Sequence, residues 1–261
     1  MTCLIRPWGH LHYRLDGLPD APAVVWAASL GLDLRMWDGV VARMPGWRHV
    51  RFDMRGHGLS STPADPWDVT DLADDAAALL DHLAIGRAVV AGCSVGGMIA
   101  MGAGLAHPAR TRALILSNTA PRIGTADLWK ARIATVRAEG MAAIAGAVME
   151  RWFAPGFRGS DAAKPWETML LRCDPAGYAG TCAALARADF RAEIGQIGCP
   201  ALLIAGGHDL ATPPDLVAQA AAMIRRSTLV TLPASGHIPA IDAPKATALA
   251  VAAFLKGLQD E

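Results

Sequence analysis

The chain of 261 residues is 52% hydrophobic and only 18% charged, a composition that excludes intrinsic disorder. Lysine and arginine together number 24, as do aspartate and glutamate, so the formal net charge is zero. That balance gives no indication of a nucleic-acid partner or of an anionic membrane surface. The mean hydropathy is +0.27, yet every apolar run stops well short of the roughly 20 residues that a membrane-spanning helix needs.

The N-terminus and the cysteines indicate where the protein resides. The first ten residues, MTCLIRPWGH, lack the basic segment, apolar stretch and cleavage site of a signal peptide. The five cysteines are odd in number and widely spaced, which argues against a disulfide framework and a structural zinc site. We therefore expect a cytoplasmic protein with reduced thiols, and we expect no metal.

Short apolar runs of strand length alternate with longer alanine- and leucine-rich stretches along most of the chain. Strands are expected at residues 23–28, 49–54, 88–93, 113–117, 201–205 and 227–232. Helices are expected at residues 70–83, 95–107, 215–224 and 245–258. This alternation predicts an α/β fold with a mostly parallel central sheet flanked by helices. Residues 10–15 precede an Asp-Gly pair and predict an additional antiparallel strand.

The alternation stops between residues 121 and 197. This stretch has long amphipathic helical patterns and no convincing strand, and strand-like sequence resumes just after it. We therefore predict a core made of residues 1–120 and 198–261. Residues 121–197 are predicted to form a helical cap inserted between two core strands.

Residues 92–96 read GCSVG and fit the pattern G-x-S-x-G, directly after an expected strand and before an expected helix. Glycines on both sides permit a strained turn that presents the Ser94 hydroxyl, so Ser94 is the candidate nucleophile. The helix that begins at Val95 directs its amides and the positive end of its dipole at a developing oxyanion. The alternative is a tight turn whose serine only caps the helix.

A serine nucleophile needs a base, and the base needs an orienting acid. His237 follows an expected strand and is the candidate base; the alternative is a solvated loop histidine. Asp209 also follows an expected strand and is the candidate acid; the alternative is a turn cap. The end of the strand at 113–117 is a competing position for the acid, but Ser117 and Asn118 offer no carboxylate there.

Two backbone N–H groups are candidate donors to the oxyanion. The first is that of Val95, which follows the nucleophile. The second is expected in the loop after the strand at 23–28, where we favour Leu30; the alternative is an ordinary strand-to-helix loop.

Residues 53–60, DMRGHGLS, lack the glycine spacing of a phosphate loop and are interpreted as a structural corner. Cys93 is expected to point into the packing, away from the serine.

These motifs resemble those of a known family. DMRGHGLS, GCSVGGMIA, LLIAGGHDLATPP and SGHIPAIDAP together resemble the α/β-hydrolase superfamily across nearly the whole chain. The segments AASLGLDLRMW, LSNTAPRIGTADLWKARIATVRAEGM, AVMERWF and GYAGTCAALARADFR are similar to those of the 3-oxoadipate enol-lactonases of the β-ketoadipate pathway for aromatic breakdown. One departure is Cys93, which stands where that family has Leu, Phe or His before the serine.

The resemblance implies an α/β-hydrolase fold and a serine hydrolase that opens a carboxylate-bearing enol-lactone to 3-oxoadipate without a cofactor. The alternatives are a general carboxylesterase, a cofactor-free perhydrolase, or a ligand-sensing protein of the same fold without catalysis. The expected partner is a small lactone or ester, with no nucleic acid and no membrane. The oligomeric state does not follow from the sequence.

The substrate carboxylate would need a cation in an otherwise apolar pocket. On a helix expected at residues 127–139, Arg132 lies about 60° from Trp129 around the axis. We therefore predict that Trp129 packs on the lactone ring and that Arg132 binds the carboxylate, with Trp152 as a second aromatic contact. The alternative is that Trp129 is ordinary core and Arg132 a solvated flank. Further cations of the cap are Arg122, Lys130, Arg137 and Arg151.

Overall fold

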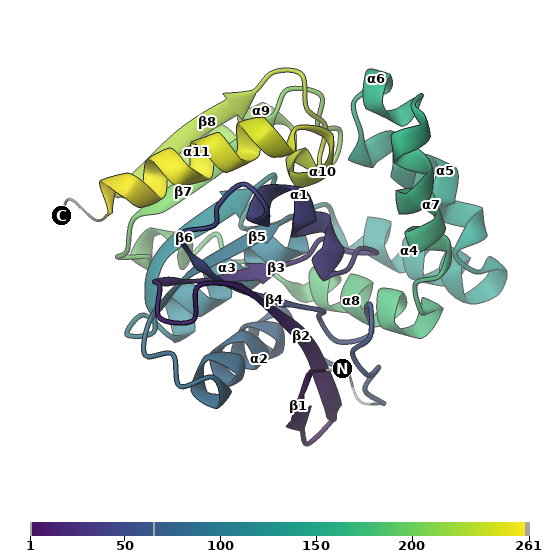
Figure 1. Ribbon diagram of the computed structural model, residues 1–261. Helices are drawn as coiled ribbons and strands as arrows, with labels where there is room; N and C mark the ends of the chain where they lie inside the picture. Colours follow the sequence, from purple (N-terminus) through teal and green to yellow (C-terminus); the bar gives the residue numbers. More distant parts are fainter. Residues whose placement is uncertain (1, 65, 259–261) are drawn as a thin grey trace.

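The strands form one eight-stranded, mostly parallel sheet in the computed structural model, which describes residues 2–64 and 66–258 (Figure 1). Their order is β1-β2-β4-β3-β5-β6-β7-β8. The pairs β1–β2 and β2–β4 are antiparallel, and the other neighbouring pairs are parallel. The strands are β1 (Cys3–Arg6), β2 (Gly9–Gly17), β3 (Ala23–Ala27), β4 (Arg48–Phe52), β5 (Ala88–Cys93), β6 (Thr111–Ser117), β7 (Ala201–Gly206) and β8 (Ser227–Leu232).

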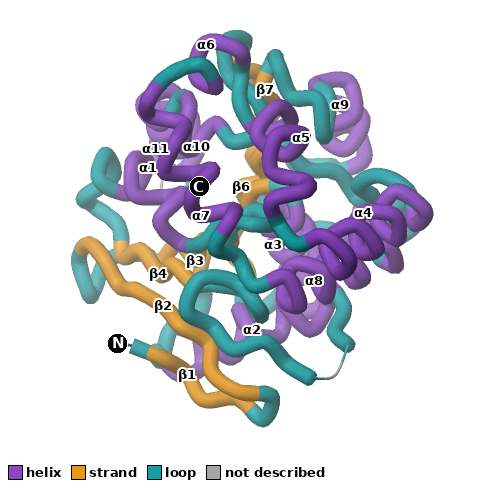
Figure 2. Tube along the Cα trace, turned by 90° about the vertical axis from the view of Figure 1, so that its right-hand side faces the viewer, coloured by secondary structure: helices purple, strands orange, loops and turns teal. Residues whose placement is uncertain are grey.

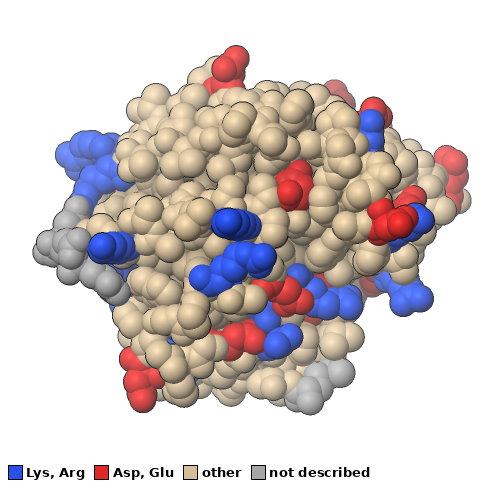
Figure 3. Space-filling model, turned by 45° about the horizontal axis from the view of Figure 1, so that its top comes forward, with Lys and Arg blue, Asp and Glu red and all other residues tan. Residues whose placement is uncertain are grey.

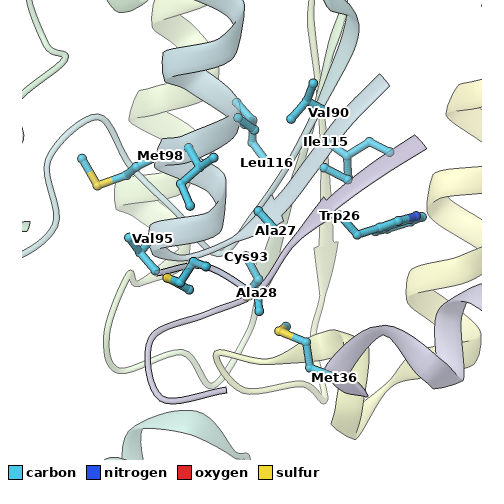
Figure 4. Close-up of a cluster of buried hydrophobic side chains, with 14 of the residues drawn as sticks. Trp26, Ala27, Ala28, Met36, Val90, Cys93, Val95, Met98, Ile115 and Leu116 are labelled. Carbon is cyan, nitrogen blue, oxygen red and sulfur yellow. The ribbon is translucent and has the colours of Figure 1, made fainter. Parts of the chain in front are cut away.

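Helices cover both faces of the sheet. α2 (Val69–His82) packs against α3 (Val95–Ala106) on one face, and α1 (Asp38–Val41) packs against α11 (Pro244–Gly257) on the other (Figure 1). Every residue of β3, β5 and β7 is buried, as the continuous apolar sequence of two-sided parallel strands requires. Successive side chains of a strand point to opposite faces of the sheet. Figure 4 shows this for β6, where Leu116 lies on the side of α3 and Ile115 on the opposite side.

Five α-helices lie between β6 and β7 in the chain. They are α4 (Ala126–Glu139), α5 (Ala142–Trp152), α6 (Pro155–Arg158), α7 (Lys164–Leu171) and α8 (Pro175–Arg187). Figure 2, seen from the right-hand side of Figure 1, shows them in front of β6 and β7. The remaining helical segments are η1 (Leu34–Trp37), η2 (Asp161–Ala163), η3 (Ile194–Gln196), α9 (Pro214–Met223) and α10 (Pro239–Asp242).

The fold class expected from the sequence is confirmed, and the expected helices are present to within one residue at each end. Three strands differ in extent by two residues at one end: β6 begins earlier than expected, at Thr111, β4 ends earlier, at Phe52, and β2 ends later, at Gly17. The short strand β1 was not expected. Three of its residues are half-buried and Ile5 is exposed, and four residues are too few to show an alternating pattern, so only pairing with β2 identifies it.

The surface view in Figure 3 shows basic and acidic side chains lying next to one another on the face displayed. Within the described ranges, no helix combines the length and the apolar character needed to cross a membrane.

Candidate active site

Ser94 sits in a strained turn between β5 and α3. Its φ of +59° and ψ of −119° place a non-glycine residue at a positive φ, which L side chains rarely adopt. A Cβ on Gly92 would lie 2.0 Å from the carbonyl oxygen of Gly96, and one on Gly96 would lie 2.4 Å from that of Ala27. Both glycines are therefore required by close backbone approach. The Ser94 side chain makes no capping hydrogen bond, which excludes the interpretation of a simple helix cap.

His237 and Asp209 meet in a buried hydrogen bond. His237 Nδ1 lies 2.8 Å from Asp209 Oδ2, and each residue is only 3% exposed. The other carboxylate oxygen accepts the backbone N–H groups of Ala211 at 2.7 Å and Thr212 at 2.9 Å. Burial raises the pKa of the Asp209 carboxyl, but the charge of His237 and the side-chain hydrogen bonds from His237, Asn118 and Thr212 outweigh it, so the pKa is lowered overall. Because Nδ1 faces Asp209, Nε2 is the ring nitrogen left for a proton transfer.

The loop that carries His237 lies against the serine turn. The Cys93 thiol donates a hydrogen bond of 3.3 Å to the carbonyl oxygen of His237. The backbone N–H of Ser94 donates to Ser117 O at 3.0 Å, and the Thr119 hydroxyl donates to Ser94 O at 2.7 Å. The serine, the histidine and the aspartate thus lie together beyond the ends of β5, β8 and β7.

The segments that carry the two candidate oxyanion donors lie next to each other. Val95 N–H opens α3, and the loop after β3 touches the same turn, since a Cβ on Gly96 would lie 2.6 Å from Ala28 O. Ser29 N–H donates to Met36 Sδ at 3.2 Å. Among the hydrogen bonds of the described residues, none uses the N–H of Val95, of Leu30 or of its neighbour Gly31. These groups are therefore available for an incoming oxygen.

Trp152 contacts both sides of the site. Its carbonyl oxygen accepts the N–H of Ile238, directly after His237, at 3.2 Å. Its ring atom Cζ2 lies 3.3 Å from the position that a Cβ on Gly31 would take. The structure therefore brings Trp152 to the candidate site, and its contact with a substrate stays a prediction.

Trp129 is 7% exposed, and its indole N–H donates to the carbonyl oxygen of Ile123, six residues earlier, at 2.7 Å. This hydrogen bond fixes the ring locally. Its contact with a substrate stays a prediction.

Arg132 is linked by one side chain to the loop at residues 29–31, which carries a candidate oxyanion donor and is called the oxyanion loop below. Its Nη1 donates to the Tyr178 hydroxyl at 3.2 Å, and Tyr178 Cε2 lies 3.2 Å from a Cβ placed on Gly31. Arg151 is half-buried nearby: burial and the positive charge of Arg132 lower its pKa, while the charge of Asp209 raises it. Of the ion pairs that the described residues form, none involves either arginine. Two cations thus share a partly buried region next to the site without a carboxylate partner.

The glycine-rich segment at residues 53–60 is a structural corner, as expected. Asp53 accepts the backbone N–H groups of Leu34 at 2.8 Å and Leu59 at 2.9 Å, so it joins two loops. A cavity of about 820 Å³ lies between this corner, residues 31–38 and α7. This cavity is not lined by Ser94, Asp209 or His237. The candidate site is therefore identified by the arrangement of these three side chains and not by the cavity.

Comparison with known proteins identifies the family to which the chain belongs. The model of the alpha/beta hydrolase family matches residues 13–251. The chain is 39% identical to 3-oxoadipate enol-lactonase 2 of Acinetobacter baylyi over 253 residues, which cover 94% of this chain and 93% of that protein. It is 36% identical to 3-oxoadipate enol-lactonase 1 of the same organism over 77% of each chain.

A solved structure agrees with these relatives. The crystal structure of the enol-lactonase from Burkholderia xenovorans LB400 superposes with a TM-score of 0.94 and 36% identity, covering 98% of this chain and 100% of that one. The chain belongs to the alpha/beta hydrolase family and is a hydrolase. The resemblance to 3-oxoadipate enol-lactonases that the sequence motifs indicated is confirmed.

Sequence reasoning missed several groups around the candidate site. Asn118 and Thr212 both donate hydrogen bonds to Asp209 Oδ2, at 2.8 and 2.7 Å. Tyr178 joins Arg132 to the oxyanion loop. Thr212 follows Asp209 by three residues, a spacing typical of a side-chain turn, and this signal was available in the sequence. Asn118 and Tyr178 lie far in the sequence from the residues that they bind, so no local sequence pattern predicts these contacts.

Proposed function

We propose that this protein opens 3-oxoadipate enol-lactone to 3-oxoadipate, in the β-ketoadipate pathway of the cytoplasm, with Ser94 as nucleophile, His237 as base and Asp209 as acid. The named relatives support the substrate class. The observation that supports it most from the chain itself is the pair of arginines beside the oxyanion loop, because a substrate that carries a carboxylate needs such a site.

In the proposed acylation, His237 Nε2 takes the hydroxyl proton while Ser94 Oγ attacks the lactone carbonyl carbon. The oxyanion accepts hydrogen bonds from the N–H groups of Leu30 and Val95, and each such donor contributes about 3 kcal/mol in comparable sites. When the tetrahedral intermediate collapses, the ring C–O bond breaks, the enol oxygen leaves with the electron pair, and His237 returns the proton to it. The enol then becomes a ketone, which prevents ring closure.

In the proposed deacylation, His237 removes a proton from water, and the resulting hydroxide attacks the ester carbon of the acyl-enzyme. The same two N–H groups hold the second oxyanion. Its collapse releases the new carboxylate and returns the proton to Ser94, so one water is consumed and the enzyme is restored. Asp209 keeps His237 oriented through its contact with Nδ1 and stabilises the imidazolium that forms twice in each cycle.

The cap is proposed to be the segment at residues 121–197 on a core of residues 1–120 and 198–261, because α4 to α8 fall between β6 and β7 and Trp152 touches two loops of the core. Arg132, with Arg151 and the Tyr178 hydroxyl, is proposed to bind the carboxymethyl arm. Trp152 is proposed to pack against the lactone ring, and Trp129 to line the cap side of the pocket.

A turnover assay with two substrates tests this function. Purified protein is incubated with the enol-lactone, whose loss of ultraviolet absorbance is followed, and separately with p-nitrophenyl acetate. We expect kcat/KM for the enol-lactone to exceed that for the neutral ester by about 100-fold, the gain expected from a well-bound carboxylate. A general esterase would prefer the neutral ester, and a ligand sensor would turn over neither; either result contradicts the proposal.

A further inference from the structure

Asp242, at the end of the short helix α10, turns its carboxylate back onto the two residues before His237. Oδ1 accepts a hydrogen bond from the hydroxyl of Ser235, and Oδ2 accepts the backbone N–H of Gly236 at 2.7 Å. Ser235 is 1% exposed and Asp242 is half-buried. Both oxygens of the carboxylate thus bind the residues just before His237, so the chain from Ser235 to Asp242 forms a closed loop that contains His237.

The opposite side of this loop is pressed against the cap segment 152–154. A Cβ on Gly236 would lie 2.7 Å from the Ala154 nitrogen and 2.7 Å from the Trp152 oxygen. Ile238 N–H donates to that same Trp152 oxygen at 3.2 Å. Burial raises the pKa of the Asp242 carboxyl, and its hydrogen bonds with Ser235 and Gly236 lower it. The base loop, residues 235–238, thus lies between the Asp242 carboxylate and the cap segment.

The position of His237 depends on this loop. Asp209 fixes the ring through Nδ1, and the backbone just before His237 is held by the hydrogen bonds to Asp242. A base must stay within a few tenths of an ångström of the proton that it abstracts, and a displacement of about 1 Å costs up to 10²-fold in rate.

We propose that Asp242 is a positioning residue that clamps the base loop between its own carboxylate and the cap segment 152–154, and so sets the place of His237. The inference rests on the proposed role of His237 as base. Asp242 touches neither the substrate nor the reacting atoms in this role. It acts through Ser235 and Gly236.

The test compares Asp242→Ala and Asp242→Asn with p-nitrophenyl acetate, whose turnover does not depend on the arginine pair. Asp242→Ala is expected to lower kcat by about 10- to 100-fold and to change KM less than threefold, since binding of a small neutral ester does not use the base. Asp242→Asn is expected to keep kcat within about fivefold of wild type. Its amide oxygen still accepts from Gly236, and its NH₂ group donates to the Ser235 hydroxyl oxygen.

Asp16→Ala is the matched control. Asp16 is also partly buried and accepts hydrogen bonds from a buried group, Arg51, but it lies on β2 and outside the site. We expect it to lower the melting temperature and to leave kcat unchanged. Should Asp242→Ala not fold, Ser235→Ala removes one of the two hydrogen bonds and is expected to lower kcat about three- to tenfold with a smaller loss of stability.

Three results overturn the proposal. The first is kcat of folded Asp242→Ala, or of Ser235→Ala in its place, within twofold of wild type. The second is a loss in Asp242→Asn as large as that in Asp242→Ala, because the negative charge and not the hydrogen bonds would then matter. The third is an equal loss in Asp16→Ala. Each of these leaves the proposed function intact, whereas a wild type inert on every ester overturns both.

Discussion

The side-chain amide of Asn118 donates a hydrogen bond of 2.8 Å to Oδ2 of Asp209, the oxygen that also faces His237 Nδ1. Its second amide hydrogen points to Gly236 O at 3.2 Å, and its own oxygen accepts the Ser117 hydroxyl at 3.0 Å. Asn118 is fully buried and has a φ of +48°. The end of β6, which has no carboxylate, thus carries the asparagine that binds the candidate acid beyond the neighbouring strand β7.

Replacing Asn118 should impair catalysis in a defined order. Asn118→Ala is expected to lower kcat about tenfold, the usual effect of losing one hydrogen bond to a charged group. Asn118→Asp should be worse, because it places a second carboxylate against Asp209 and forces the pair to share a proton. Steady-state kinetics on p-nitrophenyl acetate measure both, and an aspartate variant as active as wild type would refute this role. Ser117→Ala, which leaves both amide donors in place, serves as control.

Asp209→Asn is expected to lower kcat by about three to four orders of magnitude while the protein stays folded. The amide keeps the shape of the carboxylate but favours the wrong tautomer of His237 and cannot balance its positive charge. The measurement is kcat on the enol-lactone at neutral pH. A nearly silent variant would mean that another carboxylate orients the histidine.

The same substitution has a predictable effect on stability. The pKa of Asp209 is lowered in the folded protein, so the stabilisation that its ionised form provides is complete above the unfolded value, near pH 4, and is lost as the pH falls through the folded pKa. The free energy of unfolding of wild type should therefore decline more steeply on acidification below pH 4 than that of Asp209→Asn. Urea titrations at several pH values measure this, and identical slopes would contradict it.

Arg132→Ala is expected to raise KM for the enol-lactone at least about tenfold and to leave hydrolysis of a neutral ester of similar size nearly unchanged, since only the lactone carries a carboxylate. Arg137→Ala on the same helix is the matched control, because Arg137 is exposed. Equal losses on both substrates, or on neither, would assign the carboxylate to another residue; Arg151→Ala then becomes the informative variant.

Cys93 is expected to be a packing residue despite its position beside the nucleophile. It is fully buried, and burial is the main cause that raises the pKa of its thiol well above the usual value, so the thiolate is disfavoured. Cys93→Ala should keep kcat within about threefold and lose about 1 kcal/mol of stability, the value of one modest hydrogen bond. Inactivation of the native enzyme by a thiol reagent in proportion to labelling of Cys93 would contradict this.

The sequence predicted the three candidate reactive residues because each comes soon after a strand, and parallel strands bring their carboxyl ends to one edge of the sheet. It did not predict what holds them. Asn118 acts on a residue 91 positions away, and Arg132 on one 46 positions away, so neither contact leaves a local pattern. The helical wheel placed Arg132 near the face of Trp129, but only the packing of α4 on α8 brings it to Tyr178 and the oxyanion loop.

Mass spectrometry of the enzyme quenched during turnover of the enol-lactone tests the central claim most directly. Opening a lactone expels no fragment, so acylated enzyme should carry the full mass of the lactone, located on the peptide that contains Ser94. The adduct should be absent from Ser94→Ala, which should fold normally and show no turnover. An adduct on another residue, or a Ser94→Ala variant that consumes the lactone within tenfold of the wild-type rate, would contradict the account.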